Sequence, residues 1–439
     1  MNNYTTETYQ IKRESLNFSK KLSEGCTKPV LKFCDDMIYG MFARKSVILT
    51  DIARALKEKT KLCNVVDRLS NNLTNIFDDQ IQIIKENYEH EALKCLNFKG
   101  NDDYVIVPND DTDLNHEYSR KMEDICLVRD ASSQQEKYVN GYKVCEYVAL
   151  SPNKKSPISL YSKIYSTISD GFKSENDETI LGEDEVIKKL AKIGKEPIFV
   201  RDRGYDANVF FVKDIKEDNK FVTRLKNNRN LIFKDKSVNA FDKIKDRKGK
   251  IKTKLMYKGV NRDCYISYTK VTLPAYKEKE VCLVSVYGLK DDIDSDNDKY
   301  GDDNVIMFLT NMEVFDKESA ERIVRIYFLR WRIEEYFKSK KQNYKWEDSI
   351  VRTLNGMNNL NIFLTAVMLK LTIFIEKLDT NFLSNIILER AMALKEKCKI
   401  WFGQMSQGIF EILKYAHTGI KEWQDIEERN RTKQLELKL

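Results

Sequence analysis

The feature that most constrains the fold of this chain is a change of hydrophobic period near residue 103. Residues 1 to about 95 read as helical, with no convincing strand. Beyond them, short apolar runs bounded by turn residues or acids alternate with amphipathic helical segments. The expected strands are Tyr104–Val107, Tyr142–Leu150, Ile158–Tyr165, Pro197–Val200 and Phe221–Leu225, with helices at Glu183–Lys192 and from about Ala207. These segments predict an α/β protein with the order β-β-β-α-β-α-β.

That order is the one found in a ribonuclease H-like fold, and the rest of the chain is divided around it. The β-rich stretch 230–311 reads as an insertion into the core, because it is rich in strands and in charge. The expected segments are a helical N-terminal domain (1–95), the first part of the core (96–229), the insertion (230–311), the helices that complete the core (312–375) and a helical C-terminal region suited to dimerisation (376–439).

Two short helices in the N-terminal segment allow two interpretations. The first lies within Ser46–Leu56, with Thr50 as its N-cap, and the second runs from about Asn64 to Leu73 with Arg68 pointing outward. A brief connection between two such helices resembles a helix-turn-helix. A plain helical bundle explains the pattern equally well.

Composition narrows the class of protein and the kind of metal site. The net charge is +7, and hydrophobic residues make up 42%, which is typical of a soluble globular chain with a mildly basic balance. Nine cysteines form no C-x-x-C pair and three histidines are scattered, so a disulfide framework or a zinc finger is not expected. Any metal chemistry should therefore use carboxylates.

The chain carries no secretory type of N-terminus and no apparent membrane span. Its longest apolar stretch, Ile362–Ile375, is interrupted by Lys370 and is shorter than a bilayer requires, so a buried helix is expected. We therefore expect a cytoplasmic, nucleoid-associated protein with no membrane partner.

Two acids follow short buried strands, where a fixed backbone can direct a side chain into a cleft. They are Asp110 and Asp202. Cleavage of a phosphodiester with Mg²⁺ needs oxygen ligands of this kind. Each acid taken alone is more often a turn residue or a helix cap.

A third acid lies on a long helix expected from Lys317 to Lys341. Four of its residues recur at offsets 0, 3, 7 and 14 and therefore share one helix face: Tyr327, Arg330, Glu334 and Lys341. Basic residues on both sides of one acid suit a carboxylate that binds metal between groups that contact phosphates. The alternative is an exposed helix with an intrahelical Arg330–Glu334 ion pair.

An acidic stretch in the insertion invites comparison with a calcium-binding loop. Asp294, Asp296 and Asp298 alternate, but the sixth loop position is Lys299 and the twelfth is Val305. A calcium loop requires Gly and Glu there, so a solvated loop is expected.

The acids and the helix together resemble the bacterial insertion-sequence transposases of the DDE type, in the family (number four) with the signature Y-x2-R-x3-E-x6-K. The signature is complete as Tyr327, Arg330, Glu334 and Lys341. The second Asp lies in Asp202-Arg-Gly-Tyr-Asp206, and the first lies in Asp110-Asp-Thr-Asp-Leu114, where Asp111 or Asp113 is the alternative ligand. The resemblance covers about residues 45 to 370.

The resemblance implies an activity and a set of partners. It implies a ribonuclease H-like core in which Asp110, Asp202 and Glu334 hold two Mg²⁺ ions, with Mn²⁺ as a substitute, and in which Tyr327, Arg330 and Lys341 contact DNA. It also implies cut-and-paste movement of an element bounded by terminal inverted repeats. A homodimer would act on paired DNA ends and insert them into target DNA, and the helical N-terminal segment would help to recognise the ends.

Other functions are compatible with the same residues. One is a ribonuclease H-like nuclease without strand transfer, and another is a domesticated, catalytically inactive DNA-binding protein. Members that use hairpin intermediates hold a flipped base with an aromatic residue of the insertion. The corresponding position here is Ile306, with Phe308 nearby. We therefore assign no residue to hold a flipped base and do not predict a hairpin intermediate.

Overall fold

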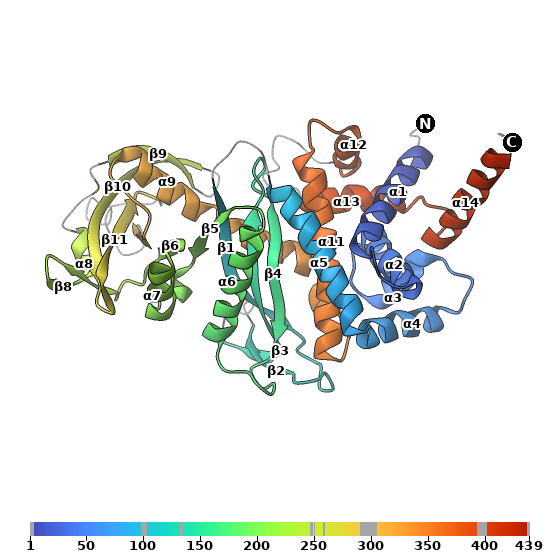
Figure 1. Ribbon diagram of the computed structural model, residues 1–439, viewed down its shortest axis with the longest axis horizontal. Helices are drawn as coiled ribbons and strands as arrows, with labels where there is room; N and C mark the ends of the chain where they lie inside the picture. Colours follow the sequence, from blue (N-terminus) through green and yellow to red (C-terminus); the bar gives the residue numbers. More distant parts are fainter. Residues whose placement is uncertain are drawn as a thin grey trace.

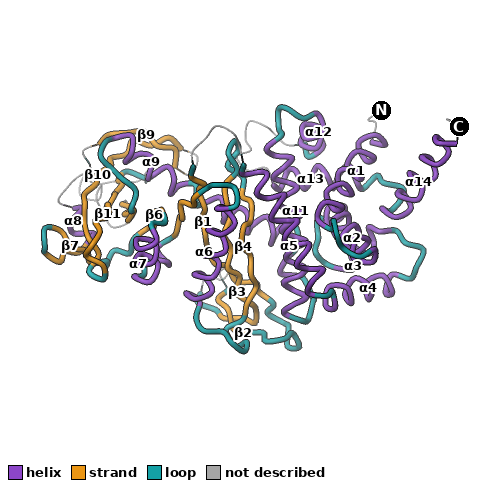
Figure 2. Tube along the Cα trace, viewed as in Figure 1, coloured by secondary structure: helices purple, strands orange, loops and turns teal. Residues whose placement is uncertain are grey.

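The computed structural model describes residues 4–97, 103–130, 135–245, 249, 251–257, 260–289, 305–392 and 402–436. It is elongated, with helices gathered at one end, a sheet in the middle and a β-rich lobe at the other end (Figure 1). Both termini lie at the helical end, on α1 and α14. Figure 2 shows the same division by element type: purple helices fill one end, and most of the orange strands lie in the middle and in the opposite lobe.

Residues 4–97 form five successive helices without a strand, which confirms the helical prediction over those residues. Their apolar faces pack on one another and on the later helices α11 (Leu354–Glu376) and α13 (Phe402–Leu413). The five are α1 (Tyr4–Leu22), α2 (Lys28–Arg44), α3 (Leu49–Leu56), α4 (Leu62–Asn75) and α5 (Asp78–Leu96).

The two helices that resemble a helix-turn-helix are α3 and α4, and two details of their prediction were wrong. Thr50 is not the N-cap, because α3 begins at Leu49 with Ile48 at the cap position. Arg68 does not simply point outward. Its guanidinium donates to Asp36 at 2.6 Å and to Glu58 at 2.7 Å, so its charge is neutralised within the helical region.

The central strands come in the predicted order, with one short additional strand. They are β1 (Tyr104–Asn115), β2 (Cys126–Arg129), β3 (Tyr138–Leu150), β4 (Pro157–Tyr165), β5 (Glu196–Arg201) and β6 (Lys220–Arg224). In the sheet β3 lies antiparallel between β4 and β1, while β5 and β6 run parallel to β1. The result is a mixed sheet with the parallel strands in its interior.

One predicted strand boundary was wrong. The first strand does not end at Val107 but continues through Pro108 to Asn115. Pro108 is tolerated because β1 changes partners at that point: it pairs with β5 through Pro108, and from Asn109 onward it pairs with β3 alone. The acids after Pro108 therefore lie within a strand and not in a turn.

The insertion extends this same sheet. Its last strand, β12 (Val305–Thr310), pairs antiparallel with β6, and the sheet continues outward through β11 and β10. The remaining elements are β7 (Asn230–Phe233), β8 (Lys236–Asn239), α8 (Ala240–Lys245), β9 (Ile251–Tyr257), β10 (Val260–Leu273) and β11 (Tyr276–Tyr287). The acidic stretch with Asp294, Asp296 and Asp298 lies outside the described residues.

Helices cover the sheet in two groups and so create two apolar cores. Helix α6 (Glu175–Ala191) packs on β3, β4 and β5, and α7 (Asn208–Glu217) packs on β6. Helix α9 (Lys317–Phe328) lies across β5, β6 and the insertion strands, with Asp316 as its N-cap. A separate core, built around Phe308, Ile323 and Tyr327, fills the space under α9.

The apolar stretch Ile362–Ile375 lies in α11, as predicted, and α11 is the central helix of the helical end. By length and composition α11 is able to cross a membrane, but 83% of its most apolar window is buried inside the protein. It lies between β4 and the helices α2, α4, α5 and α13. Lys370 on this helix is paired with Glu14 at 2.8 Å. Helices α12 (Phe382–Arg390) and α14 (Ile420–Glu436) complete the chain.

Candidate active site

Asp110 and Asp202 are brought together by the parallel pairing of β1 and β5. Pro108 of β1 is in register with Val200 of β5, and each acid lies two residues further along its own strand. Neighbouring strands are about 4.8 Å apart, and residues two apart point to the same face. The two carboxylates therefore lie side by side, where β5 ends and β1 continues. The sequence signal for this arrangement was an acid at the same position after each of two short apolar strands, two residues beyond Pro108 and two residues beyond Val200.

Asp202 occupies the turn between β5 and α7. It precedes a short 3₁₀ turn, Arg203–Tyr205, and its side chain is 33% exposed. Tyr327 donates its hydroxyl to Asp202 Oδ1 at 3.0 Å. Arg224, which sequence reasoning missed, lies 3.8 Å from the same oxygen. The second acid is thus held by one residue from α9 and one from the end of β6.

The third acid reaches the site through a tightening of the long helix. The predicted single helix is divided into α9 and α10 (Trp331–Lys338), because Leu329 and Arg330 bond to the carbonyls three residues back. This turn directs Arg330 to Asp110, with Nη1 donating to Oδ2 at 3.0 Å. The other nitrogen, Nη2, is paired with Glu334. Arg330 therefore bridges two of the three acids.

Five of the six predicted site residues meet at this point, and Lys341 does not. Helix α10 is followed by a π turn, Ser339–Asn343, which contains Lys341. Its ammonium group bonds to the carbonyl of Asp113 and lies 3.0 Å from Glu347. Asp113 is three residues beyond Asp110 on β1, about 10 Å along the strand. Lys341 therefore lies further along β1 than the three acids, and its contact with DNA stays a prediction.

Asp110 has a different environment from the two alternative acids. Burial raises the pKa of Asp110 to about 6, and the nearby negative charges of Asp202 and Glu334 add to this, while Arg330 opposes it. Asp111 projects to the other face of the strand, where it meets Cys145 and Tyr205, and burial raises its pKa to about 7. The charge of Glu175 acts on Asp111 and Asp113. Asp110 is the acid of this cluster that shares its surroundings with Asp202 and Glu334.

The three acids suit a hard divalent cation. All three offer carboxylate oxygens, the ligands that Mg²⁺ prefers. Burial is the main cause of the raised pKa of Asp110, and the charges of Asp202 and Glu334 add to it. Arg330 supplies the positive charge at the centre of the group. An ion bound by Asp110 and Glu334 would take over these two contacts and release the guanidinium toward a phosphate.

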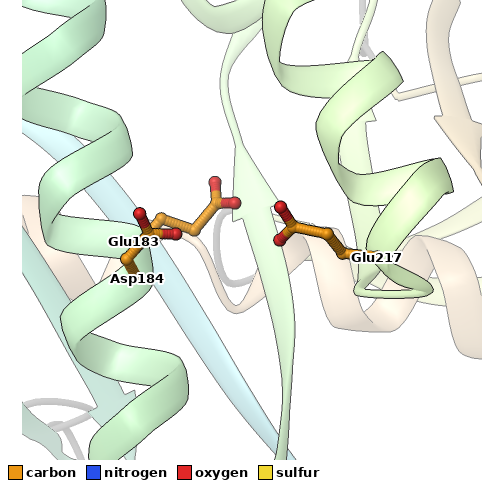
Figure 3. Close-up of side chains that lie close together, drawn as sticks. All are labelled: Glu183, Asp184 and Glu217. Atoms are coloured by element: carbon orange, nitrogen blue, oxygen red, sulfur yellow. The ribbon is translucent and has the colours of Figure 1, made fainter.

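A second acidic group lies behind β5. Ligand oxygens of Glu183, Asp184 and Glu217 come within 4.8 Å of one another, and Figure 3 shows Glu217 on one helix facing Glu183 and Asp184 on another. Lys213 bonds to all three at 2.7–2.9 Å. Its ammonium group already supplies the positive charge that a metal ion would bring. We therefore interpret the three acids and Lys213 as an ion-pair network.

This network anchors the residue next to Asp202. Arg201 is fully buried and paired with Glu183 of α6 and Asp214 of α7. Successive strand residues point to opposite faces, so Arg201 fixes the end of β5 from one side while Asp202 faces the acids on the other. Sequence reasoning missed Arg201, although an arginine directly before a strand-end acid was a visible signal.

The residues considered for a flipped base are both buried. Ile306 is 8% exposed and Phe308 is fully buried, with its ring 4.5 Å from that of Tyr327. Phe308 therefore supports Tyr327 by packing. Trp331, between Arg330 and Glu334 in the sequence, is the exposed aromatic side chain on α10, at 49%.

Carboxylates that lie side by side where the pairing of two parallel strands ends, beside an arginine between two helices, are the arrangement expected of an α/β protein that acts on phosphodiesters. Residues 104–369 match the family described as "Transposase DDE domain". The match begins at the first residue of β1, contains all six predicted site residues and spans more than half of the chain, so the chain belongs to this family of transposases. A search of curated proteins finds no match.

The family confirms the resemblance at its coarser level. The chain is a transposase of the DDE class, whose members act in DNA transposition and generally use divalent metal ions. Membership also implies DNA as a binding partner. The subtype defined by the Y-x2-R-x3-E-x6-K signature stays a prediction.

Proposed function

We propose that this chain catalyses metal-dependent cleavage at the ends of an insertion sequence and joins those ends to target DNA, in cut-and-paste transposition of the family-four type. In this proposal Asp110, Asp202 and Glu334 bind two Mg²⁺ ions, for which Mn²⁺ can substitute. The order β4-β3-β1-β5-β6, antiparallel and then parallel, supports a ribonuclease H-like core.

One observation carries the proposal. Arg330 pairs with both Asp110 and Glu334, while Tyr327 from the same helical segment donates to Asp202. Residues separated by up to 224 positions in the sequence therefore converge on one point. These carboxylates, at the point where the parallel pairing of β1 and β5 ends, are the oxygen ligands that the proposed ions require.

Each group has a distinct role in the proposed reaction. Asp110, Asp202 and Glu334 would hold divalent ions, which would supply activation of the attacking hydroxyl and stabilisation of the leaving oxygen. Arg330 then holds a non-bridging phosphate oxygen through its planar fork of donors. Tyr327 keeps Asp202 in one orientation, and Arg224 adds positive charge beside it. The exposed ring of Trp331 offers a stacking surface for a base next to the scissile phosphate.

The assembly is part of the same proposal. The N-terminal helical segment, residues 1–95, contributes to recognition of terminal inverted repeats, and a homodimer acts on the paired ends. The mild positive charge of the chain, +7, favours association with polyanionic DNA.

A cleavage and joining assay tests the proposal. Wild type is compared with Asp202→Asn on duplex DNA carrying the ends of the element, with Mg²⁺. Asp184→Asn, from the Lys213 network, is the matched control because it removes an equivalent acid outside the site. We expect nicking and joining in wild type and in the control, and loss of both in Asp202→Asn.

Other outcomes separate the alternative functions. Nicking without joining would favour a nuclease. Binding without cleavage by either protein would favour a catalytically inactive DNA-binding protein. Full cleavage by Asp202→Asn would remove Asp202 from the site.

A further inference from the structure

A groove lies at the N-terminal ends of β1 and β5 and contains none of the six predicted site residues. Its volume is about 570 Å³, and it is bounded by α9 on one side and by the turn between β3 and β4 on the other. Tyr104 and Ile106 of β1 and Ile198 of β5 form its floor. We propose that this groove binds unpaired deoxynucleotides of the DNA strand that continues from the scissile phosphate. The inference rests on the proposed function, since it takes DNA as the substrate.

Both sides of the groove lead to the acids. Along the floor, Asp110 lies four residues beyond Ile106 on β1, about 13 Å further along the strand. Along the wall, Arg330 lies eight residues beyond Arg322, about 12 Å along a helix. Asp110 and Arg330 bond to each other, so the floor and the wall meet at the proposed active site. A DNA strand that leaves the groove toward that point would cover this distance with roughly two nucleotides.

The charge of the rim suits a polyanion. Four basic residues line the groove, Lys155, Lys195, Arg322 and Arg325, against the two acids Glu318 and Glu321. Glu321 is paired with Arg325 at 3.4 Å and with Lys317 at 3.8 Å. The rim therefore keeps a net positive charge, and phosphate neutralisation by such side chains is the main source of DNA affinity.

The floor suits bases more than a closed duplex. Its apolar lining includes the partly exposed side chains of Tyr104 and Ile106, packed against the buried Ile198. A basic groove with an aromatic floor is the general form of a single-strand binding site, in which bases stack and phosphates face the cations. The volume falls in the range of sites for small ligands, roughly 300–1,000 Å³, which accommodates one or two nucleotides.

A binding assay in EDTA tests the groove separately from cleavage. The probes are a blunt duplex and the same duplex with a four-thymidine overhang at its 3′ or 5′ end, each measured by fluorescence anisotropy. The double variant Arg322→Ala/Arg325→Ala is compared with Lys188→Ala/Lys192→Ala, which removes two exposed lysines, one on α6 and one at its C-cap. We expect the groove variant to bind one of the two overhang duplexes about tenfold more weakly than wild type does. Its affinity for the blunt duplex should be nearly unchanged.

A second measurement covers the aromatic floor. Tyr104→Ala should lose the overhang preference, while Tyr104→Phe should keep it, since a phenyl ring stacks on a base as a phenol does. Photocrosslinking of 5-iododeoxyuridine in the overhang should label the wild type at Tyr104. Equal losses on blunt and overhang DNA, or crosslinks only at other elements, would overturn the proposal. If the protein prefers overhang DNA but does not cleave, the proposed nucleotide binding in the groove is supported and only the proposed catalytic function is contradicted.

Discussion

Lys340 and Glu146 form a fully buried ion pair, with Nζ 3.1 Å from Oε2 and neither side chain exposed. Glu146 lies on β3 directly opposite Asp110 on β1, and Lys340 lies in the π turn that follows α10. Ser159 and Ser162 donate to the same carboxylate. The pair therefore joins the helix that carries Glu334 to the strand beside Asp110.

Lys340→Met should strongly destabilise the protein. Removing one member of a buried pair leaves the other charge without compensation, which costs about 3–5 kcal/mol. Urea unfolding measures the change in the free energy of unfolding. Lys338→Met, at an exposed position on α10, is the control and should change stability little. Because adding Glu146→Gln removes the orphaned charge, the double variant should recover part of the loss. Strictly additive losses would contradict a coupled pair.

Arg330→Lys should retain the fold and lose most of the cleavage activity. A lysine keeps the positive charge but is a point charge, so it cannot bridge Asp110 and Glu334 with two separate donors. We expect the rate of nicking to fall about 100-fold, the scale seen when one preorganised donor is lost. Arg332→Lys is the control, because Arg332 pairs with Glu335, 3.3 Å away and outside the site. Equal activity in the two variants would mean that the bridge is not needed.

Asp110→Asn should stabilise the metal-free protein at pH 8 but not at pH 4. Burial raises the pKa of Asp110 to about 6 from its ordinary value of 3.8. The folded state then binds more protons than the unfolded state between these values, so stability falls as the pH rises through this window. Asparagine carries no charge and avoids that loss, for a gain of roughly 3 kcal/mol well above pH 6.

Unfolding in EDTA at several pH values tests this. Asp184→Asn, whose carboxylate is 43% exposed, is the control. A gain for Asp110→Asn that is the same at pH 4 and pH 8 would rule out titration of Asp110 as its cause. With Mg²⁺ present, the rate of cleavage by wild type should decrease at pH values below about 6, because Asp110 must be ionised to bind a cation.

The strands and two of the acids could be predicted because they depend on local pattern. Short apolar runs identified β1, β5 and β6, and the equivalent positions of Asp110 and Asp202 after such runs indicated that the two would be neighbours. The continuation of β1 beyond Pro108 could not be predicted, since it depends on pairing with β3, whose partner residues lie more than 25 positions away.

The helix that carries Glu334 was predicted in position but not in shape. Ideal spacing assumes 3.6 residues per turn throughout, whereas the chain tightens at Arg330 and widens into the π turn at Ser339–Asn343. The tightening accompanies the contact of Arg330 with Asp110, and the π turn accompanies the burial of Lys340 against Glu146. Both contacts are long-range, so the local sequence carries no signal for them.

Lys341 should contribute to DNA affinity through charge and not through catalysis, because it lies near Asp113 and Glu347, away from the three acids. Lys341→Ala should weaken binding of duplex DNA at low salt and reduce the slope of log affinity against log salt concentration by about 1. Glu347→Gln should have the opposite effect, since it frees the ammonium group from its carboxylate partner, 3.0 Å away. Lys345→Ala is the control, because that lysine is 49% exposed and pairs with Asp51 on α3. Fluorescence anisotropy over a salt titration gives the slopes. An unchanged slope for Lys341→Ala would show that Lys341 serves the structure of the π turn and makes no phosphate contact.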